Sequence, residues 1–182
     1  MPVAATDHLV ITAVGGDRPG IVNRLSTVIV ERNCNISDSR MAILGGEFAV
    51  ILLVNGTVTD IEQLQRTLDQ QQQQLGLTII TKPTHGQVRP AERQHYIVEV
   101  VTLDQPGVVQ RLTGFFAERN INIADLSTAS YAAPHTGTAM FELQMRVDIP
   151  TGTDLDALRD QYLNFCEGLD MDTSFEIARD ED

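Results

Sequence analysis

The two halves of the chain show the same order of hydrophobic and polar positions. Residues 9–14 and 96–101 are apolar, β-branched runs of the kind that form buried strands. Each run is followed by a segment, 21–29 or 108–116, in which apolar residues recur at helical spacing and would share one face of a helix. The pattern therefore predicts a strand and then an amphipathic helix near the start of each half.

Two further strands, a second helix and a last strand complete each half. Asn33 and Asn120 follow the first helices and are predicted to end them, because Asn readily adopts the left-handed conformation that terminates helices. The later elements are predicted at 35–43, 48–54 and 77–81, with a helix that Asp60 caps, and at 122–130, 138–147 and 173–178, with a helix that Asp154 caps. The order βαββαβ occurs twice, so the expected fold class is α+β, with two tandem ferredoxin-like units.

A duplication accounts for this symmetry. When the sequence is laid over itself with a shift of 87 residues, 12 of the 22 positions in Asp17–Asp38 are identical to those in Asp104–Asp125. Average composition alone would give roughly one or two matches. We therefore expect one domain over residues 1–81, a linker over 82–95 and a second domain over 96–182.

Charge narrows the range of partners. The chain carries 25 acidic and 13 basic residues, a formal net charge of −12. Sequence-independent binding to nucleic acid needs clustered Lys and Arg that displace counterions, so direct nucleic-acid binding is not expected. The last 29 residues hold ten acidic and two basic residues, which places eight of the twelve excess negative charges there. We expect a basic partner protein to dock on this region, through Asp156, Asp160 and Glu167.

Residues for catalysis or metal binding form no recognisable motif. The four histidines are dispersed without metal-ligand spacing, and no glycine-rich phosphate loop is present. His135 lies in a long predicted loop where a role could be tested, although a solvated surface position is the favoured interpretation. We therefore expect a protein that is not an enzyme and that needs no metal and no cofactor.

Nothing in the sequence indicates secretion or a membrane. The N-terminus lacks the basic and apolar regions of a signal peptide, and no apolar stretch approaches the length of a membrane span. Cys34 and Cys166 lie in apolar-periodic segments and form no disulfide framework, which suits reduced thiols that pack as small hydrophobes. The expected location is therefore cytoplasmic.

The Asp-x-Pro-Gly turns, at Asp17–Gly20 and Asp104–Gly107, are the candidate ligand sites. Each delivers a strand into a helix N-terminus, whose first backbone N–H groups lack partners inside the helix and can receive a carboxylate. Glycine lets a ligand approach the backbone, and the neighbouring Asp can pair with an ammonium group, so the turn suits an α-amino acid. Asn35 and Asn122, which open the second strands, could add amide hydrogen bonds to the carboxylate. The alternative is structural: Asp caps the helix, Pro fixes φ at the first turn, and Gly relieves a tight bend.

These segments resemble the signature of ACT domains, which are small βαββαβ modules that sense amino acids. The resemblance rests on Asp17-Arg18-Pro19-Gly20-Ile21-Val22 with Asn33-Cys34-Asn35-Ile36, and on Asp104-Gln105-Pro106-Gly107-Val108-Val109 with Asn120-Ile121-Asn122-Ile123. Two such domains that make up nearly the whole chain are similar to the glycine cleavage system transcriptional repressor family.

The resemblance implies a regulator without a DNA-binding domain of its own. Such a protein acts by contact with a transcriptional activator and responds to a small amino-acid effector, with glycine as the first candidate. By the family's pattern, the turn of one ACT unit and the second-strand start of a paired unit form the effector site. The candidate residues on this chain are Asp17, Arg18, Pro19, Gly20, Ile21, Asn35, Asp104, Pro106, Gly107, Val108 and Asn122.

Differences between the two copies leave other interpretations open. Position 18 is Arg whereas position 105 is Gln, and the second copy has a longer loop at 131–137, so the two sites are expected to differ. One alternative function is an ACT interaction module that has lost its ligand. The other is a relative of the ACT part of formyltetrahydrofolate deformylase, although that enzyme needs a formyl-hydrolysing domain and the second half here repeats the first. ACT units pair by sheet edges or helix faces, so a homodimer is one expected assembly.

Overall fold

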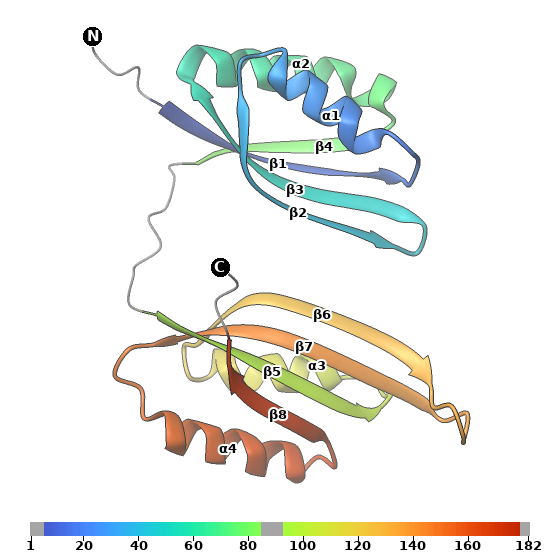
Figure 1. Cartoon of the computed structure of the whole chain (residues 1–182), viewed down its shortest axis with the longest axis vertical. Helices are drawn as coiled ribbons and strands as arrows, with labels where there is room; N and C mark the ends of the chain where they lie inside the picture. The colour runs from blue at the N-terminus through green and yellow to red at the C-terminus, as the bar shows by residue number, and fades with distance from the viewer. Residues whose placement is uncertain (1–5, 85–92, 179–182) are drawn as a thin grey trace. The chain divides into compact units, whose positions relative to one another are not determined.

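The computed structural model describes residues 6–84 and 93–178 and has two compact units, one within residues 1–88 and one within 89–182. The first unit contains β1 (Thr6–Gly16), α1 (Ile21–Val30), β2 (Asn35–Leu44), β3 (Glu47–Thr57), α2 (Val58–Leu75) and β4 (Thr78–Thr84). The second contains β5 (Arg93–Leu103), α3 (Val108–Ala117), β6 (Asn122–Ala132), β7 (Ala139–Pro150), α4 (Leu155–Glu167) and β8 (Asp172–Ile177). The predicted order βαββαβ is confirmed in both units (Figure 1).

Each unit is built on a four-stranded antiparallel sheet. The strand order is β2-β3-β1-β4 in the first unit and β6-β7-β5-β8 in the second, so the first strand of each unit lies inside its sheet and the second strand lies at an edge. This order requires crossovers between strands that are not neighbours, and the helices provide them. The α+β, ferredoxin-like class is therefore confirmed.

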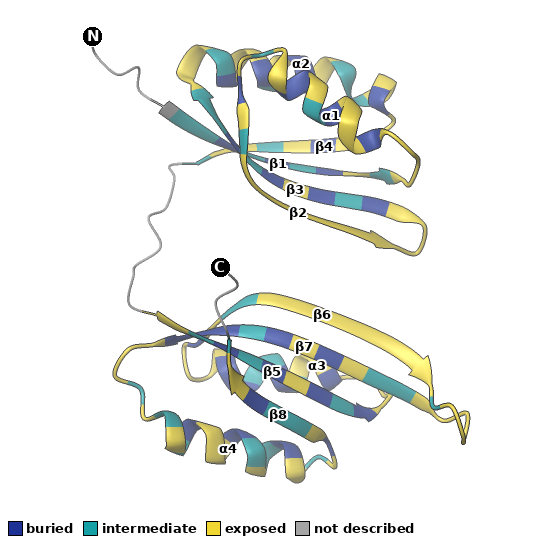
Figure 2. Ribbon diagram, viewed as in Figure 1, coloured by how far each residue is buried: buried dark blue, intermediate teal, exposed yellow. Residues whose placement is uncertain are grey.

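The two helices of each unit lie against one face of their sheet, and the strand sequences explain why (Figure 2). In β3 the buried residues are Phe48, Val50, Leu52 and Val54, and the residues between them are exposed or half-buried. Successive side chains of a strand point to opposite faces of the sheet. One face therefore packs against the helices, and the other stays open.

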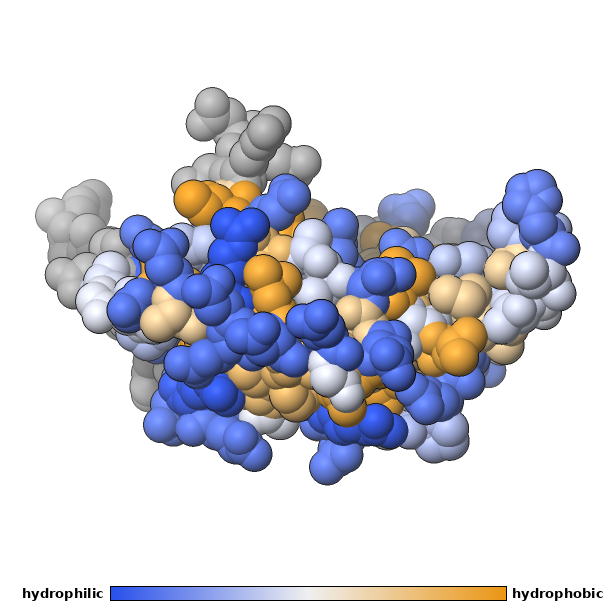
Figure 3. All heavy atoms as spheres, turned by 90° about the horizontal axis from the view of Figure 1, so that it is seen from below, coloured by the Kyte–Doolittle hydropathy of each residue, from blue (hydrophilic) through white to orange (hydrophobic). Residues whose placement is uncertain are grey.

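The helix side of the second unit is largely hydrophilic. Figure 3 looks onto the side on which α4 lies and shows hydrophilic residues over most of it, with hydrophobic residues in separate groups. Asp156, Asp160 and Glu167 are exposed along α4. The structure thus places these three carboxylates at the surface.

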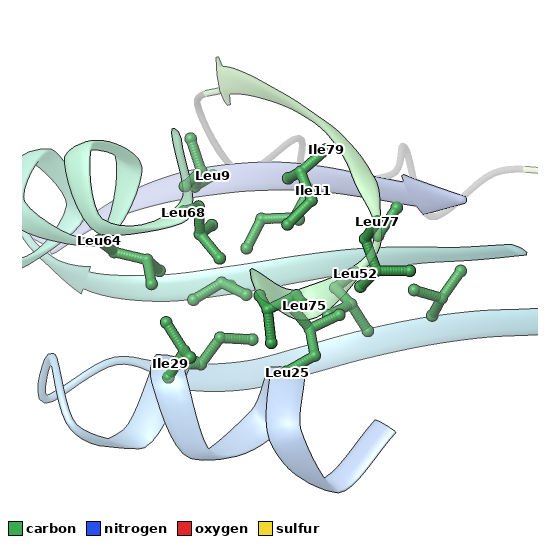
Figure 4. Close-up of a cluster of buried hydrophobic side chains, with 14 of the residues drawn as sticks. Leu9, Ile11, Leu25, Ile29, Leu52, Leu64, Leu68, Leu75, Leu77 and Ile79 are labelled. Atoms are coloured by element: carbon green, nitrogen blue, oxygen red, sulfur yellow. The ribbon is translucent and has the colours of Figure 1, made fainter. Parts of the chain in front are cut away.

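The core of the first unit lies between its helices and its sheet. Leu25 and Ile29 of α1 and Leu64 and Leu68 of α2 are almost completely buried, together with strand residues such as Ile11 (Figure 4). These positions recur at the three- and four-residue spacing of one helical face. The hydrophobic periodicity of the sequence is therefore the pattern that fills this core.

The core of the second unit is richer in aromatic side chains. Phe115 and Phe116 of α3 meet Tyr162 of α4, with ring centroids 5.2 Å apart in each pair. Phe175 of β8 lies 5.8 Å from Tyr162. These tilted and edge-to-face contacts lock α3 and α4 against each other and against the sheet.

The first helix of each unit ends slightly before its predicted stop. Asn33 and Asn120 have left-handed φ values of 54° and 56°, as predicted. However, α1 already ends at Val30 and α3 at Ala117, and a turn connects each helix to its Asn.

The caps of the second helices are predicted correctly in one unit only. Asp154 caps α4, and its carboxylate accepts the Ala157 N–H at 3.1 Å. The prediction that Asp60 caps α2 is wrong, because Thr57 is the N-cap and its hydroxyl accepts the Asp60 N–H at 3.2 Å. The helix starts earlier than its apolar periodicity indicates, since β3 runs directly into it at Thr57.

The strands extend beyond their predicted ends on both sides of the predicted linker. β4 continues to Thr84 and β5 begins at Arg93, so the outer parts of the range 82–95 belong to strands. Residues 85–92, which include the rest of that range, lie outside the described residues. The domain limits proposed from the sequence otherwise stay a prediction.

Replacing Thr57 with Ala removes the cap of α2, because Ala has no oxygen to accept the Asp60 N–H. We expect Thr57→Ala to lower the free energy of unfolding of the first unit by about 1 kcal/mol, whereas Thr57→Ser keeps the hydroxyl and stays near the parent value. Urea unfolding of the full chain, followed by circular dichroism, measures the difference. Equal values for the two variants would show that the cap contributes nothing.

Candidate effector site

The turn between the first strand and first helix has the same backbone conformation in both units. Gly20 is the N-cap of α1 with φ 84° and ψ 2°, and Gly107 is the N-cap of α3 with φ 91° and ψ 0°. These left-handed values favour glycine, which has no Cβ. The Asp17 N–H donates to the Gly46 carbonyl at 3.1 Å, and the Asp104 N–H makes a similar bond at 3.0 Å. Each turn is thereby tied to the hairpin that follows the helix.

No side chain caps the N-terminus of α1 or α3. The N-cap residue makes no side-chain hydrogen bond, and the first helical turn holds no acidic residue. The structural alternative in which Asp caps the helix is therefore wrong: glycine takes that position, and Asp17 and Asp104 are exposed beside Pro19 and Pro106. In α1 the Ile21 N–H already donates to the Arg18 carbonyl at 3.4 Å. The N–H groups of the residues that follow in the first turn of each helix lack an intrahelical partner and remain able to bind an anion.

An open hollow of 570 Å³ lies beside the first turn. Its lining brings Asp17 and Gly20 together with Val22 of α1 and with Met41 and Ile43 of β2. Met41 and Ile43 are 57% and 52% exposed, so the hollow combines a carboxylate and an open helix N-terminus with apolar walls. This combination matches the ammonium, carboxylate and side chain of an amino acid.

Three predicted site residues have structural partners within their own unit. The Arg18 guanidinium donates to the carbonyl of Leu75, at the C-terminal end of α2. Ile21 and Val108 are 4% and 2% exposed and lie in the cores, so only their backbone can face a ligand. Gln105 takes the place of Arg18 in the second unit. This exchange therefore affects a residue that, in the first unit, ties the turn to the second helix.

Asn35 and Asn122 lie at the opposite end of their sheets from the turns. In the first unit Asn35 is in register with Asn55, which pairs with His8 near the start of β1, whereas the turn follows Gly16 at the end of that strand. The strand between His8 and Gly16 spans about 26 Å at roughly 3.3 Å per residue. The turn and the Asn of one unit therefore cannot contact the same amino acid, and a site that uses both needs a second unit.

Asn122 belongs to a polar cluster that the sequence analysis does not predict. Asp148 is 8% exposed and accepts hydrogen bonds from Asn122 Nδ2 at 3.1 Å and from His95 Nδ1 at 2.8 Å. Arg93 Nη1 lies 3.8 Å from the same carboxylate. The cluster ties the starts of β5 and β6 to the end of β7.

The first unit has an uncharged version of this cluster. Asn55 takes the place of Asp148, in register with Asn35 and His8. The buried Asn55 Oδ1 accepts no hydrogen bond from the part of the chain that the structure describes. The charged cluster could have been predicted from Asp148 in the sequence, because a carboxylate within an otherwise apolar strand requires hydrogen-bond or charge partners.

The environment of Asp148 keeps its carboxyl group ionised. Burial by itself would raise the pKa of Asp148, but hydrogen bonds from Asn122 and His95, together with the charges of His95 and Arg93, hold this pKa below its ordinary value. The carboxylate is therefore a stabilising acceptor that holds three strands together.

The described residues contain no recognisable catalytic or metal site. No group of three His, Cys, Asp or Glu residues among them could hold a metal ion. Burial raises the pKa of the Cys34 and Cys166 thiols, which opposes formation of the nucleophilic thiolate. His135 is exposed in the loop between β6 and β7. No helix within 6–84 or 93–178 is long and apolar enough to cross a membrane.

The βαββαβ order and the open strand-to-helix turns define the class of protein. Models of the ACT domain match residues 7–82 and 96–130. Both units are therefore ACT domains, and the chain is a tandem ACT protein.

The similarity to one family extends over nearly the whole chain. The chain is 32% identical over 178 residues to the glycine cleavage system transcriptional repressor of Escherichia coli (strain K12), an alignment that covers 98% of this chain and 94% of that protein. The chain therefore belongs to the glycine cleavage system transcriptional repressor family. This homology supports a regulatory role for the two ACT domains.

Solved structures contain the same tandem fold. A crystal structure assigned to a glycine cleavage system transcriptional repressor aligns with a TM-score of 0.74 and 32% identity, over 97% of this chain and 100% of that chain. A protein of unknown function from Galdieria sulphuraria aligns with a TM-score of 0.83 and 28% identity, over 96% of this chain and 100% of that chain.

The lowered pKa of Asp148 makes the stability of the second unit depend on pH. Because the folded-state pKa lies below the unfolded value, the stabilisation is complete above the unfolded pKa and is lost as the pH falls through the folded pKa. We expect destabilisation below about pH 4, near the ordinary Asp pKa. Asp148→Asn should weaken that dependence and cost about 1–3 kcal/mol at neutral pH, because it disrupts buried hydrogen bonds.

Chemical unfolding of the full chain across a series of pH values measures both effects. Asp172→Asn, which neutralises an exposed carboxylate in β8, is the matched control and should behave like the parent. An Asp148→Asn protein with the parent's stability and acid sensitivity would contradict the assigned role.

Proposed function

We propose that the chain is an amino-acid-responsive regulator that controls transcription through contact with another protein and does not bind DNA itself. The observation that carries the proposal is the pair of uncapped helix N-termini behind Gly20 and Gly107, in ACT domains of a family named for transcriptional repression. The net charge of −12 favours contact with a protein over contact with nucleic-acid phosphates.

The effector in this proposal is an α-amino acid. Its carboxylate binds the free N–H groups of the first helical turn, and its ammonium group pairs with Asp17 or Asp104. Because Asn35 lies at the far end of its own sheet, a paired unit supplies the amide that completes the site. Glycine is the first effector to test, since the relatives are named for the glycine cleavage system.

The two turns differ in the walls that surround them. Met41 and Ile43 of β2 line the hollow at the first turn. Thr128 and Ser130 of β6 occupy the corresponding register positions in the second unit. The first turn therefore suits an effector with an apolar side chain, and the second suits a smaller or more polar one.

The proposed protein partner is a transcriptional activator with a basic surface. Asp156, Asp160 and Glu167 lie exposed on α4, on the largely hydrophilic side seen in Figure 3. Complementary charge on a partner would steer its approach and set its orientation, with an effect that weakens as ionic strength rises. The acidic face of α4 is therefore the proposed docking surface, separate from the two turns.

Calorimetry against a panel of amino acids tests the effector site. We expect saturable binding that Asp17→Asn weakens about tenfold, because the variant keeps the size of the side chain but loses the charge that pairs with ammonium. Asp69→Asn, at an exposed position on α2, is the control and should bind like the parent. If no amino acid gives saturable heat, the sensor is refuted and the ligand-free interaction module is favoured.

A second test uses the partner protein itself. The immobilised full chain captures this partner from an extract of the native host, with and without glycine. We expect the combined variant Asp156→Asn, Asp160→Asn and Glu167→Gln to bind the captured partner more weakly and with a smaller salt dependence. The matched control neutralises Glu31, Glu47 and Asp69, which are exposed on the first unit. Unchanged affinity and salt dependence in the α4 variant would refute the docking surface.

A further inference from the structure

The outer face of the first sheet, which its helices leave uncovered, is apolar. On this face the central strands present Val10, Val14, Ile51 and Leu53, and β4 adds Ile80, with Thr12 between Ile51 and Ile80 and Arg40 of β2 beside Ile51. The residues that alternate with them along β1, β3 and β4 are mostly buried. Ile51 is 47% exposed and Ile80 is 66% exposed. Large apolar surfaces of this kind on a folded protein mark interaction sites.

The corresponding face of the second sheet is more polar, although Ile97 and Val101 take the positions of Val10 and Val14. The positions equivalent to Ile51 and Leu53 carry Gln144 and Arg146, and Glu99 and Ser174 occupy the neighbouring central and edge strands. Gln144 Nε2 donates to Glu99 Oε1 at 2.8 Å across this face. Because the two units share one fold, the apolar face is a property of the first unit and not a requirement of the fold.

The register of the first sheet places opposite charges at the two ends of one row. Asp38 on β2 pairs with Leu53, Leu53 pairs with Val10, and Val10 pairs with Lys82 on β4. The row therefore reads negative, apolar, apolar, positive. Asp38 also lies 3.0 Å from Arg40, but both side chains are more than half exposed, so this pair is weak and leaves Asp38 available.

This row is complementary to itself. A rotation of 180° about an axis that runs parallel to the strands, between β1 and β3, exchanges the two edges of the sheet. Asp38 of one copy then lies over Lys82 of a second copy, and Leu53 lies over Val10. An isologous interface forms every such contact twice.

We propose that the outer face of the first sheet is a homodimer interface, in which two copies of the chain pack their first sheets face to face about this two-fold axis. Aligned sheets pack about 10 Å apart with strand directions within about 30°, a geometry that a long Lys side chain spans. Four strands about 4.8 Å apart and roughly ten residues long present roughly 600 Å² of projected face. That is the scale of the ~800 Å² of accessible surface that each partner buries in a stable interface.

The self-complementary row favours a second copy as the occupant. The equivalent face of the second sheet keeps Ile97 and Val101, but Glu99, Glu142 and Arg146 on the same two central strands interrupt its apolar surface with charges. The proposal concerns assembly alone and does not depend on the identity of an effector or a transcriptional partner.

Sedimentation equilibrium of the full chain, over a range of concentrations, measures the association directly. We expect a dimer for the parent and at least a tenfold weaker association for Ile51→Lys, which places a charge at the centre of the face. Gln144→Lys introduces the same side chain at the equivalent position of the second sheet and should leave the dimer unchanged. Circular dichroism checks that both variants fold, which is expected because each position is solvent-accessible and Lys can extend its charge to water.

A charge exchange tests the two-fold axis itself. Asp38→Lys alone and Lys82→Asp alone each place like charges opposite one another and should weaken the dimer severalfold. The double variant restores opposite charges at both contacts and should return the dissociation constant close to the parent value. Recovery in the double variant cannot come from a structural effect on one chain, because Asp38 and Lys82 lie at opposite edges of the sheet.

Four results would overturn the proposal. If the parent chain is a monomer, no second copy packs on the outer face of the first sheet. Dissociation by Gln144→Lys, or an unchanged dimer in Ile51→Lys, would place the interface elsewhere. A double charge exchange that fails to recover association would exclude the proposed axis.

Discussion

One-sided packing of two helices on a four-stranded sheet is the constraint on which the rest of each unit depends. Side chains alternate along a strand, so the face of β3 that carries Phe48 and Leu52 must be covered, while the opposite face has no helix left to cover it. The same arrangement places the start of α1 at one end of the sheet and the start of β2 at the other. The open turn, the distant Asn35 and the uncovered outer face all follow from this single layer of helices.

The turns show how a backbone requirement leaves N–H groups available to bind an anion. Glycine occupies the N-cap in both units because the chain needs a left-handed residue to pass from the strand into the helix. A side-chain cap is thereby lost, and neither Asp17 nor Asp104 satisfies the N–H groups of the first turn, of which that of Ile21 in α1 donates to the backbone carbonyl of Arg18. The residue that gives the turn its shape is thus also the residue that leaves an anion-binding group available.

Duplication supplied two copies of the same scaffold, and the differences between them, some buried and some exposed, leave the order and pairing of the strands unchanged. The buried cluster around Asp148 has an uncharged counterpart at Asn55, and Arg18, which contacts the second helix, corresponds to Gln105. The outer sheet faces differ most, because neither is needed to form a core. The two units therefore share one architecture but have different surfaces.

The sequence by itself determined the repeat, the order of elements, the left-handed Asn33 and Asn120, and the Pro-Gly turns, because each depends on periodicity or on the local preferences of a few residues. Tertiary structure decided the rest. Thr57 rather than Asp60 caps α2 because β3 runs straight into that helix, and the register of strands far apart in the chain separates the turn from Asn35 and gathers Asn122 and His95 around Asp148. These relations depend on which strands pair and on where each strand begins, and no short segment of the chain contains that information.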